Sequence, residues 1–306
     1  MPAYLARRLV QAALILLGVA AITYLLLYML PADPARMVAG RSATKEQVDL
    51  VRMQLGLNQP IWQQFASYLW KLLQGDLGRS YLQRTQVTDL LAARLPASLL
   101  LMVGAIFCEL VIGLTLGTIA GLRRATGTDH TLMVIALMFI STPQFVIALS
   151  MIYVFAYWLG WFPIGGYGEF KHLVLPAVTL GLLGGGWYAR VTRSSVIEVL
   201  RQDFIRTARA KGLNRWRIVS VHILPNAVLP IIAMVGIDIG YFMGSIVVVE
   251  SVFGWPGIGQ LTWQAIQQID IPIIMGVTLL SACAIVLGNL LADLVAPLID
   301  PRIKLR

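Results

Sequence analysis

The chain alternates between long apolar runs and shorter polar segments. The apolar runs cover residues 9–30, 97–122, 132–159, 173–188, 227–249 and 273–299. A helix needs about 20 apolar residues to cross the roughly 30 Å hydrocarbon core of a bilayer. Every run except the fourth reaches that length. The pattern therefore predicts an all-α, polytopic membrane protein with six transmembrane helices.

The fourth run is the least regular of the six. It is short, and it contains Pro176 and the glycines at 184–186, residue types that favour bends in helices. Two interpretations stay open from the sequence. The helix either extends through Ala189 toward Val199 or bends at the glycines.

Composition supports a membrane protein. Charged residues make up 13% of the chain, against about 25% in soluble domains, and hydrophobic residues make up 58%. The mean hydropathy is +0.76. The first run follows Arg7 and Arg8 and is longer than the roughly 7 to 15 apolar residues of a signal peptide. We therefore expect it to be retained as an anchor.

Basic residues indicate the orientation of the chain. With the N-terminus inside, the cytoplasmic segments hold most of the Lys and Arg residues, whereas the two short outer loops hold only Lys171. Cytoplasmic loops of membrane proteins are enriched in these residues. We therefore expect both termini to be cytoplasmic. The net charge of +9 then reflects this bias, and no nucleic-acid partner is expected.

The segment of residues 31–96 is predicted to be extracytoplasmic and helical. Thr44 and Gln47 fit a capping box, and Gly56 fits the residue after a helix end. A second helix is predicted with Asn58 as its cap and Pro60 in its first turn, ending at Gly75. Its apolar stripe lies either on the outer membrane surface or against the bundle, and comprises Ile61, Trp62, Phe65, Leu69, Leu72 and Leu73.

Acidic residues within the runs are candidates for function, because a charge near the bilayer centre costs at least about 3 kcal/mol. Asp238 lies midway along the fifth run and either lines a transport path or bonds to a neighbouring helix. Glu250 is expected to hold the turn of residues 253–259. Asp293 lies near enough to Arg302 for a structural role, and Glu109 has no partner visible in the sequence.

Cysteines and histidines give no sign of a metal site or a disulfide. Cys108 and Cys283 lie inside predicted spans. The histidines are far apart, so interfacial or hydrogen-bonded roles are expected for them; they are His130, His172 and His222.

Glycines recur every fourth residue in two of the runs. Such spacing forms a groove that lets helices approach closely. The sequence does not name the partner helices. The glycines are Gly113, Gly117 and Gly121 in the second run and Gly236, Gly240 and Gly244 in the fifth.

A polar, basic segment separates the fourth and fifth runs. Apolar residues at helical spacing form a stripe at Ile197, Leu200, Phe204 and Ala208, with Arg206 and Arg209 directed elsewhere. Gly212 fits a left-handed residue that closes the helix, and Asn214 can cap the next one. Such a helix can dock another protein or rest on the inner lipid surface.

Several strings together resemble a known family. Residues 206–212 read RTARAKG, and Gly212, Leu224 and Pro225 fit the frame of a docking loop, although Arg206, Thr207 and His222 depart from the general form. Other matching strings are MLPADPAR (29–36), QLGLNQP (54–60), GDLGRS (75–80), ESVFGWPGIG (250–259) and IDPRI (299–303). In this order they resemble the membrane subunits of bacterial ABC importers, in the peptide and nickel branch.

The resemblance implies a type I importer permease fold in the bacterial inner membrane. It implies a second, similar but non-identical permease, two ATPase subunits that bind ATP and Mg, and an extracytoplasmic substrate-binding protein. Peptide-like substrates are expected (dipeptides, oligopeptides or glutathione), with nickel or another small solute as the alternative. The chain has no phosphate-binding loop of its own, so no catalytic residue, metal or cofactor is expected on it.

The resemblance also divides the chain. It implies an N-terminal end with the first span (1–30), the outer segment (31–96), a five-helix core (97–299) with a coupling loop (190–225), and a tail (300–306). Residues of the outer motif are Glu250, Phe253, Pro256, Gly257 and Gly259. Residues expected to contact the ATPase are Phe204, Arg206, Thr207, Ala208, Arg209, Ala210, Lys211, Gly212, Leu224 and Pro225.

Two other classes of protein remain as alternatives. A proton-coupled secondary transporter would usually show an internal repeat, and none is visible. A membrane-embedded enzyme would need a converging set of nucleophile, base or metal ligands, and no such set is apparent in the sequence.

Overall fold

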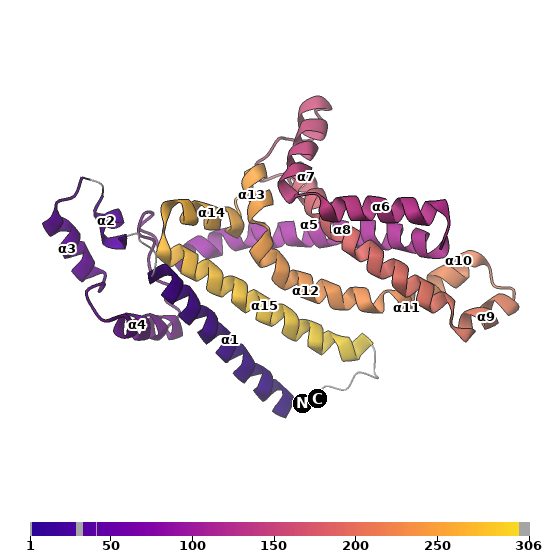
Figure 1. Ribbon diagram of the computed structural model, residues 1–306, viewed down its shortest axis with the longest axis horizontal. Coiled ribbons are helices and arrows are strands. Elements are labelled where there is room, and N and C mark those ends of the chain that lie inside the picture. Colours follow the sequence, from indigo (N-terminus) through magenta and orange to yellow (C-terminus); the bar gives the residue numbers. More distant parts are fainter. Residues whose placement is uncertain (1, 29–32, 41, 300–306) are drawn as a thin grey trace.

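The computed structural model describes residues 2–28, 33–40 and 42–299, and this part of the chain is built from helices joined by loops. Figure 1 shows a bundle of long helices with α2, α3 and α4 at one end and α9 and α10 at the other. The predicted all-α architecture is therefore confirmed.

Within the described ranges, four helices are long and apolar enough to cross a membrane. They are α1 (Pro2–Tyr28), α5 (Val87–Leu122), α8 (Phe170–Leu200) and α15 (Ile271–Ile299). Two bent pairs of helices raise the number to six if each pair is one span. Their halves meet at angles of 103° and 46°.

The third apolar run is one of these bent pairs. It contains α6 (Gly127–Ser141), then α7 (Gln144–Met151) and the π-helix η1 (Ile152–Trp158), and the bend of 103° falls between α6 and α7. Pro143 lacks an N–H and disfavours helical backbone at Thr142, which is extended with ψ at 127°. The third run is therefore bent at Thr142 and is not one continuous helix.

The fifth run is broken at both ends. Most of this run forms α12 (Leu229–Ser245). Three short elements precede α12, namely α10 (Arg215–Arg217), the π-helix η2 (Ile218–Ile223) and α11 (Leu224–Ala227). The chain bends by 46° between these elements and α12. The last residues of the run lie in the separate helix α13 (Val247–Phe253), followed by α14 (Ile258–Gln268). By contrast, α8 is one continuous helix through Pro176 and the glycines, so the longer of the two interpretations holds.

The outer segment contains α2 (Pro34–Ala39), α3 (Lys45–Gln54) and α4 (Ile61–Leu73). The capping box is confirmed, because Gln47 N–H donates to Thr44 Oγ1 at 3.4 Å and Thr44 N–H donates to Gln47 Oε1 at 3.0 Å. Gly56 and Gly75 have positive φ after the helix ends, as expected. Asn58 does not cap α4, because Pro60 occupies that position.

The stripe on α4 is divided between two environments. Tyr24 of α1 contacts the rings of Phe65 and Tyr68, with centroids 5.3 and 5.8 Å apart. Trp62 and Leu73 are exposed. One edge of α4 therefore rests on the bundle and the other does not. The helix that follows, α5, begins at Val87 rather than at Ala97 and runs through Pro96.

Glycines bring α5 and α8 into close contact along their length. A Cβ on Gly117 would lie 2.5 Å from the Ala189 carbonyl oxygen, and one on Gly121 would lie 2.7 Å from Val196 Cγ1. Gly113 packs directly against Tyr188. The predicted groove is confirmed, and its partner is α8.

The second glycine repeat packs α12 against α15. A Cβ on Gly240 would lie 2.9 Å from Ile285 Cα, and one on Gly288 would lie 3.1 Å from the Gly236 carbonyl oxygen. The packing around Gly244 lies outside the part of the chain that the structure describes.

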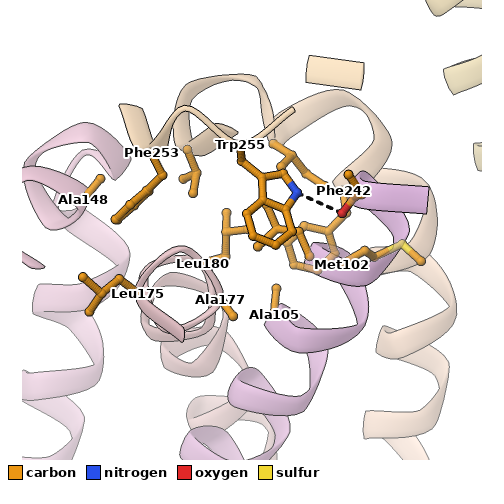
Figure 2. Packing of buried hydrophobic residues seen from close by; sticks show 13 residues of the cluster. Met102, Ala105, Ala148, Leu175, Ala177, Leu180, Phe242, Phe253 and Trp255 are labelled. Atoms are coloured by element: carbon orange, nitrogen blue, oxygen red, sulfur yellow. Dashed lines mark hydrogen bonds between the residues drawn. The ribbon is translucent and has the colours of Figure 1, made fainter. Parts of the chain in front are cut away.

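The largest buried cluster lies where α13 and the following turn meet α5, α7, α8 and α12 (Figure 2). Trp255 is its largest member, and its indole Nε1–H donates to the Ala97 carbonyl oxygen at 2.9 Å. Phe253 points toward Ala148 in the same view, and Leu175 belongs to the same cluster. This cluster anchors the turn after α13 to α5 and α8.

Candidate functional site

The polar loop between α8 and α12 folds into short helices at one end of the bundle (Figure 1). After α8 ends at Leu200, Arg201 and Gln202 interrupt the helix before α9 (Asp203–Ala210). Gly212 has φ of 71°, and Asn214 Oδ1 accepts a hydrogen bond from Trp216 N–H at 3.2 Å. The predicted roles of Gly212 and Asn214 in ending and starting helices are therefore confirmed.

The predicted apolar stripe across this loop is wrong in one respect. Ile205 and Ala208 are the buried residues of α9, whereas the Phe204 side chain is 43% exposed. The break at Arg201 and Gln202 ends one helix and starts another, so residues 197 to 208 do not share a continuous face. Phe204 therefore projects outward.

A buried cluster holds α9 in place. It joins α8, α9, η2 and α11 and comprises Val196, Ile205, Ala208, Ile218, Val219, Ile223 and Ala227, with Leu224 half-buried against it. The remaining predicted contact residues are exposed: Arg206, Thr207, Arg209, Ala210, Lys211, Gly212 and Pro225. The loop thus has a rigid base and a basic outer surface.

A recess of about 380 Å³ opens beside this surface. It lies between the ends of α5 and α8 and the loop, and Arg209 and Arg215 line it together with apolar residues such as Leu122 and Leu213. An apolar recess with a charged rim can accept a helix or side chain from another protein.

Glu250 organises the outer motif. Its carboxylate accepts hydrogen bonds from Ser98 Oγ at 2.6 Å and from Gln260 N–H at 3.0 Å. Ser98 Oγ also accepts from Ile258 N–H at 2.8 Å. Because Glu250 is fully buried, these bonds tie α13, α14 and α5 together.

The other residues of the outer motif surround this carboxylate. A side chain on Gly257 would overlap the Glu250 carboxylate, and a Cβ on Gly259 would lie 2.7 Å from Val247 Cα. Phe253 is buried and Pro256 is half-buried. The geometry suits a structural joint better than a substrate contact.

Asp238 lies on α12 and bonds across the bundle to α8. The Tyr188 hydroxyl donates a hydrogen bond to Asp238 Oδ2. Glu109 of α5 packs against Gly184, one turn before Tyr188 on α8. The sequence singled out the two acids separately, and the structure brings them together.

Two further polar contacts were not expected from the sequence. Arg193 of α8 makes a bidentate ion pair with Asp129 of α6, with its Nε 2.6 Å from Oδ1 and its Nη2 2.8 Å from Oδ2. Asp270 accepts a hydrogen bond from Ser80 Oγ at 2.5 Å, which ties the loop before α5 to the start of α15. Both pairs join residues far apart in the sequence, so no local pattern signals them.

The end of the bundle that carries α2, α3 and α4 contains a cavity of about 640 Å³, which lies between α1, these helices and α15. Tyr81 lies in its wall. Burial, with a smaller contribution from the charge of Asp270, raises the pKa of the Tyr81 hydroxyl to about 12. This hydroxyl is therefore neutral at physiological pH.

The remaining candidates have simple surroundings. His130 Nδ1 lies 2.9 Å from the Thr126 carbonyl oxygen, and Glu169 N–H donates to His172 Nδ1 at 3.4 Å, as expected for hydrogen-bonded histidines. Among the described residues, no three His, Cys, Asp or Glu side chains group as metal ligands. The side chain of Asp293, all of Arg302, residues 29–32 of the 29–36 string and most of the 299–303 string lie outside the described residues.

Comparison with solved structures shows the fold. Two structures entitled as inward-facing conformations of the MetNI methionine ABC transporter superpose with a TM-score of 0.58. They are 20% and 21% identical in sequence, and the match covers 69% of this chain and 96% and 97% of those chains. This identity supports a shared fold and nothing beyond it.

Comparison with curated proteins is closer. The chain is similar to the glutathione transport system permease protein GsiC of Escherichia coli O6:H1 (strain CFT073), Escherichia coli K12 and Shigella boydii serotype 4. Each is 38% identical over 301 residues, which cover 98% of both chains.

Family patterns cover nearly the whole sequence. Residues 1–102 match the N-terminal part of the membrane components of binding-protein-dependent transport systems, and residues 113–305 match the inner membrane component itself. The chain therefore belongs to the family of inner membrane components of binding-protein-dependent transport systems.

Proposed function

We propose that this chain forms half of the path through which an importer moves peptide-like substrates, namely dipeptides, oligopeptides or glutathione. The observation that carries the proposal is the 38% identity, over 98% of both chains, to glutathione permeases. The other half of the path would come from a second, similar but non-identical permease.

Family membership sets the general role. The chain is a multi-pass, non-catalytic permease subunit of the bacterial inner membrane in an ABC importer. It works with a substrate-binding protein and with ATPase subunits, which bind and hydrolyse ATP. This membership replaces the alternatives of a proton-coupled transporter and a membrane-embedded enzyme.

We further propose that the loop of residues 190–225 contacts the ATPases. Phe204 projects from α9 beside exposed Arg206 and Arg209, while Ile205 and Ala208 anchor the helix. A rigid base transmits a push better than a mobile loop does, so ATP-driven closure of the ATPases would tilt α8 and α12. Contact of the same surface with lipid headgroups is the competing interpretation.

Orientation follows from the same assignment. The loop would face the cytoplasm together with both termini, and residues 31–96 would face outward. Asp238 would line the path, because it is half-exposed on α12. Its bond to Tyr188 also supports the alternative role of a polar link between helices.

Uptake by the reconstituted complex tests the substrate class. The chain would be co-expressed with its companion permease, ATPases and binding protein and placed in proteoliposomes with ATP inside or outside as orientation requires. We expect ATP-dependent accumulation of a labelled dipeptide or glutathione. Accumulation of nickel alone, with no peptide uptake, would replace this proposal with the nickel alternative.

A further inference from the structure

Three polar side chains from three different helices meet within the bundle. Glu109 comes from α5, Tyr188 from α8 and Asp238 from α12. The Tyr188 hydroxyl donates to Asp238 Oδ2, and the Glu109 carboxyl packs against Gly184, one turn before Tyr188 on α8. The cluster therefore concentrates two acidic groups in a low-dielectric region.

Glu109 is the least satisfied member. It is 3% exposed, and its Oε2 has no hydrogen-bond partner among the described residues. Its other oxygen lies against Gly184, where a side chain would overlap the carboxyl. Buried polar atoms are usually paired, and those that are not call for an explanation. The absence of a side chain on Gly184 therefore leaves room for a carboxyl group with one oxygen that has no partner among the described residues.

Neither acid of the cluster has a cationic partner among the described side chains. The ion pairs among the described residues use the carboxylates of Asp33, Asp49, Asp129 and Asp203. Two carboxyl groups cannot both ionise readily in such a region, and a positive charge placed beside them would favour their ionised forms. The cluster is therefore suited to a cation that comes from outside the chain.

We propose that Glu109, Tyr188 and Asp238 form a subsite for the ammonium group of the transported substrate. The inference rests on the proposed function, since every peptide-like substrate with a free amino terminus carries this group. Asp238 is half-exposed and offers the entry, while Glu109 and Tyr188 are buried behind it.

The chemistry of the cluster favours an ammonium over other ligands. A primary ammonium has three N–H donors, and the cluster offers acceptor oxygens on three side chains. A free carboxylate placed there would oppose ionisation of the two acids. Nickel binds imidazole nitrogen readily, whereas this cluster offers oxygen alone.

Substrate pairs separate this role from a purely structural link between α8 and α12. Uptake by the full reconstituted complex would be measured for a dipeptide and for its N-acetylated form, with loading of the binding protein by each peptide measured separately. Variants would be Glu109→Gln and Asp238→Asn, which keep shape but remove charge. Thr192→Val is the control, because Thr192 is a buried residue one turn along α8 whose hydroxyl also lacks a partner.

We expect both charge-removing variants to lower uptake of the free dipeptide about tenfold and to change uptake of the acetylated peptide less than about twofold, while Thr192→Val changes neither. If the variants leave free-dipeptide uptake intact, or lower uptake of both peptides equally, the subsite is refuted and the proposed function stands. If the wild-type complex takes up no peptide, the proposed function fails first and the subsite with it.

Discussion

Arg193→Ala should destabilise the protein more than any other single loss of a basic side chain on α8. Arg193 supplies two hydrogen bonds to Asp129, whose side chain is 2% exposed. In the described part of the chain, the only other donor to that carboxylate is the Ala125 N–H, at 2.9 Å. Removing the guanidinium would leave a buried carboxylate with one bond.

Breaking a buried ion pair by deleting one partner costs about 3–5 kcal/mol. The Arg193 side chain is itself 30% exposed, so water would partly solvate the gap. We therefore expect a loss of about 3 kcal/mol, near the lower limit. Replacing both residues with Ala removes the stranded charge and should recover more than half of the loss.

The assay is thermal unfolding of the purified complex, followed by loss of the monodisperse fraction after heating. Arg190→Ala is the matched control, since Arg190 lies on the same helix with its guanidinium 5.3 Å from the Trp187 ring centre, a contact worth about 0.5–1 kcal/mol. The prediction is refuted if Arg193→Ala and Arg190→Ala unfold at the same temperature, or if the double variant is no more stable than Arg193→Ala.

Three further predictions concern packing and topology. Gly117→Leu should force α5 and α8 apart at a cost of about 1–3 kcal/mol or more, seen as low membrane abundance; normal abundance would argue against the tight contact. Glu250→Ala should strand the donors that it accepts from, at about 1–3 kcal/mol each, whereas Glu250→Gln keeps an acceptor and should melt higher; equal melting would contradict the joint. In a background without native cysteines, Gln83→Cys should react with an impermeant thiol reagent from outside and Lys211→Cys should not; labelling of Lys211→Cys from outside would reverse the proposed orientation.

Apolar run lengths were sufficient to predict an all-helical membrane protein. They could not reveal the bend at Thr142 and Pro143, because the apolar residues continue on both sides of it. They also underestimated α8, whose second half is polar in sequence yet buries Thr192 and Val196 against α5. Hydropathy measures composition, and helix continuity depends on backbone sterics and packing.

The same contrast applies to the candidate sites. Gly212 and Asn214 act on their own backbone neighbours, so their roles were predictable. The exposed position of Phe204 was not, because a short break at Arg201 changes which residues face inward. The grouping of Glu109 with Asp238 depends on how α5, α8 and α12 pack, which no local pattern encodes.

We propose above all that the loop of residues 190–225 couples ATP hydrolysis by the ATPases to movement of substrate through this chain. Phe204→Asp tests it most directly, with Leu82→Asp as a control of equal exposure, 43% against 42%, in the proposed outer segment. The measurement is ATP hydrolysis stimulated by loaded binding protein, recorded with uptake in the same proteoliposomes. We predict that Phe204→Asp loses ATPase binding or hydrolyses ATP without uptake, while Leu82→Asp remains coupled. Normal assembly and normal coupled uptake with Phe204→Asp would contradict the account.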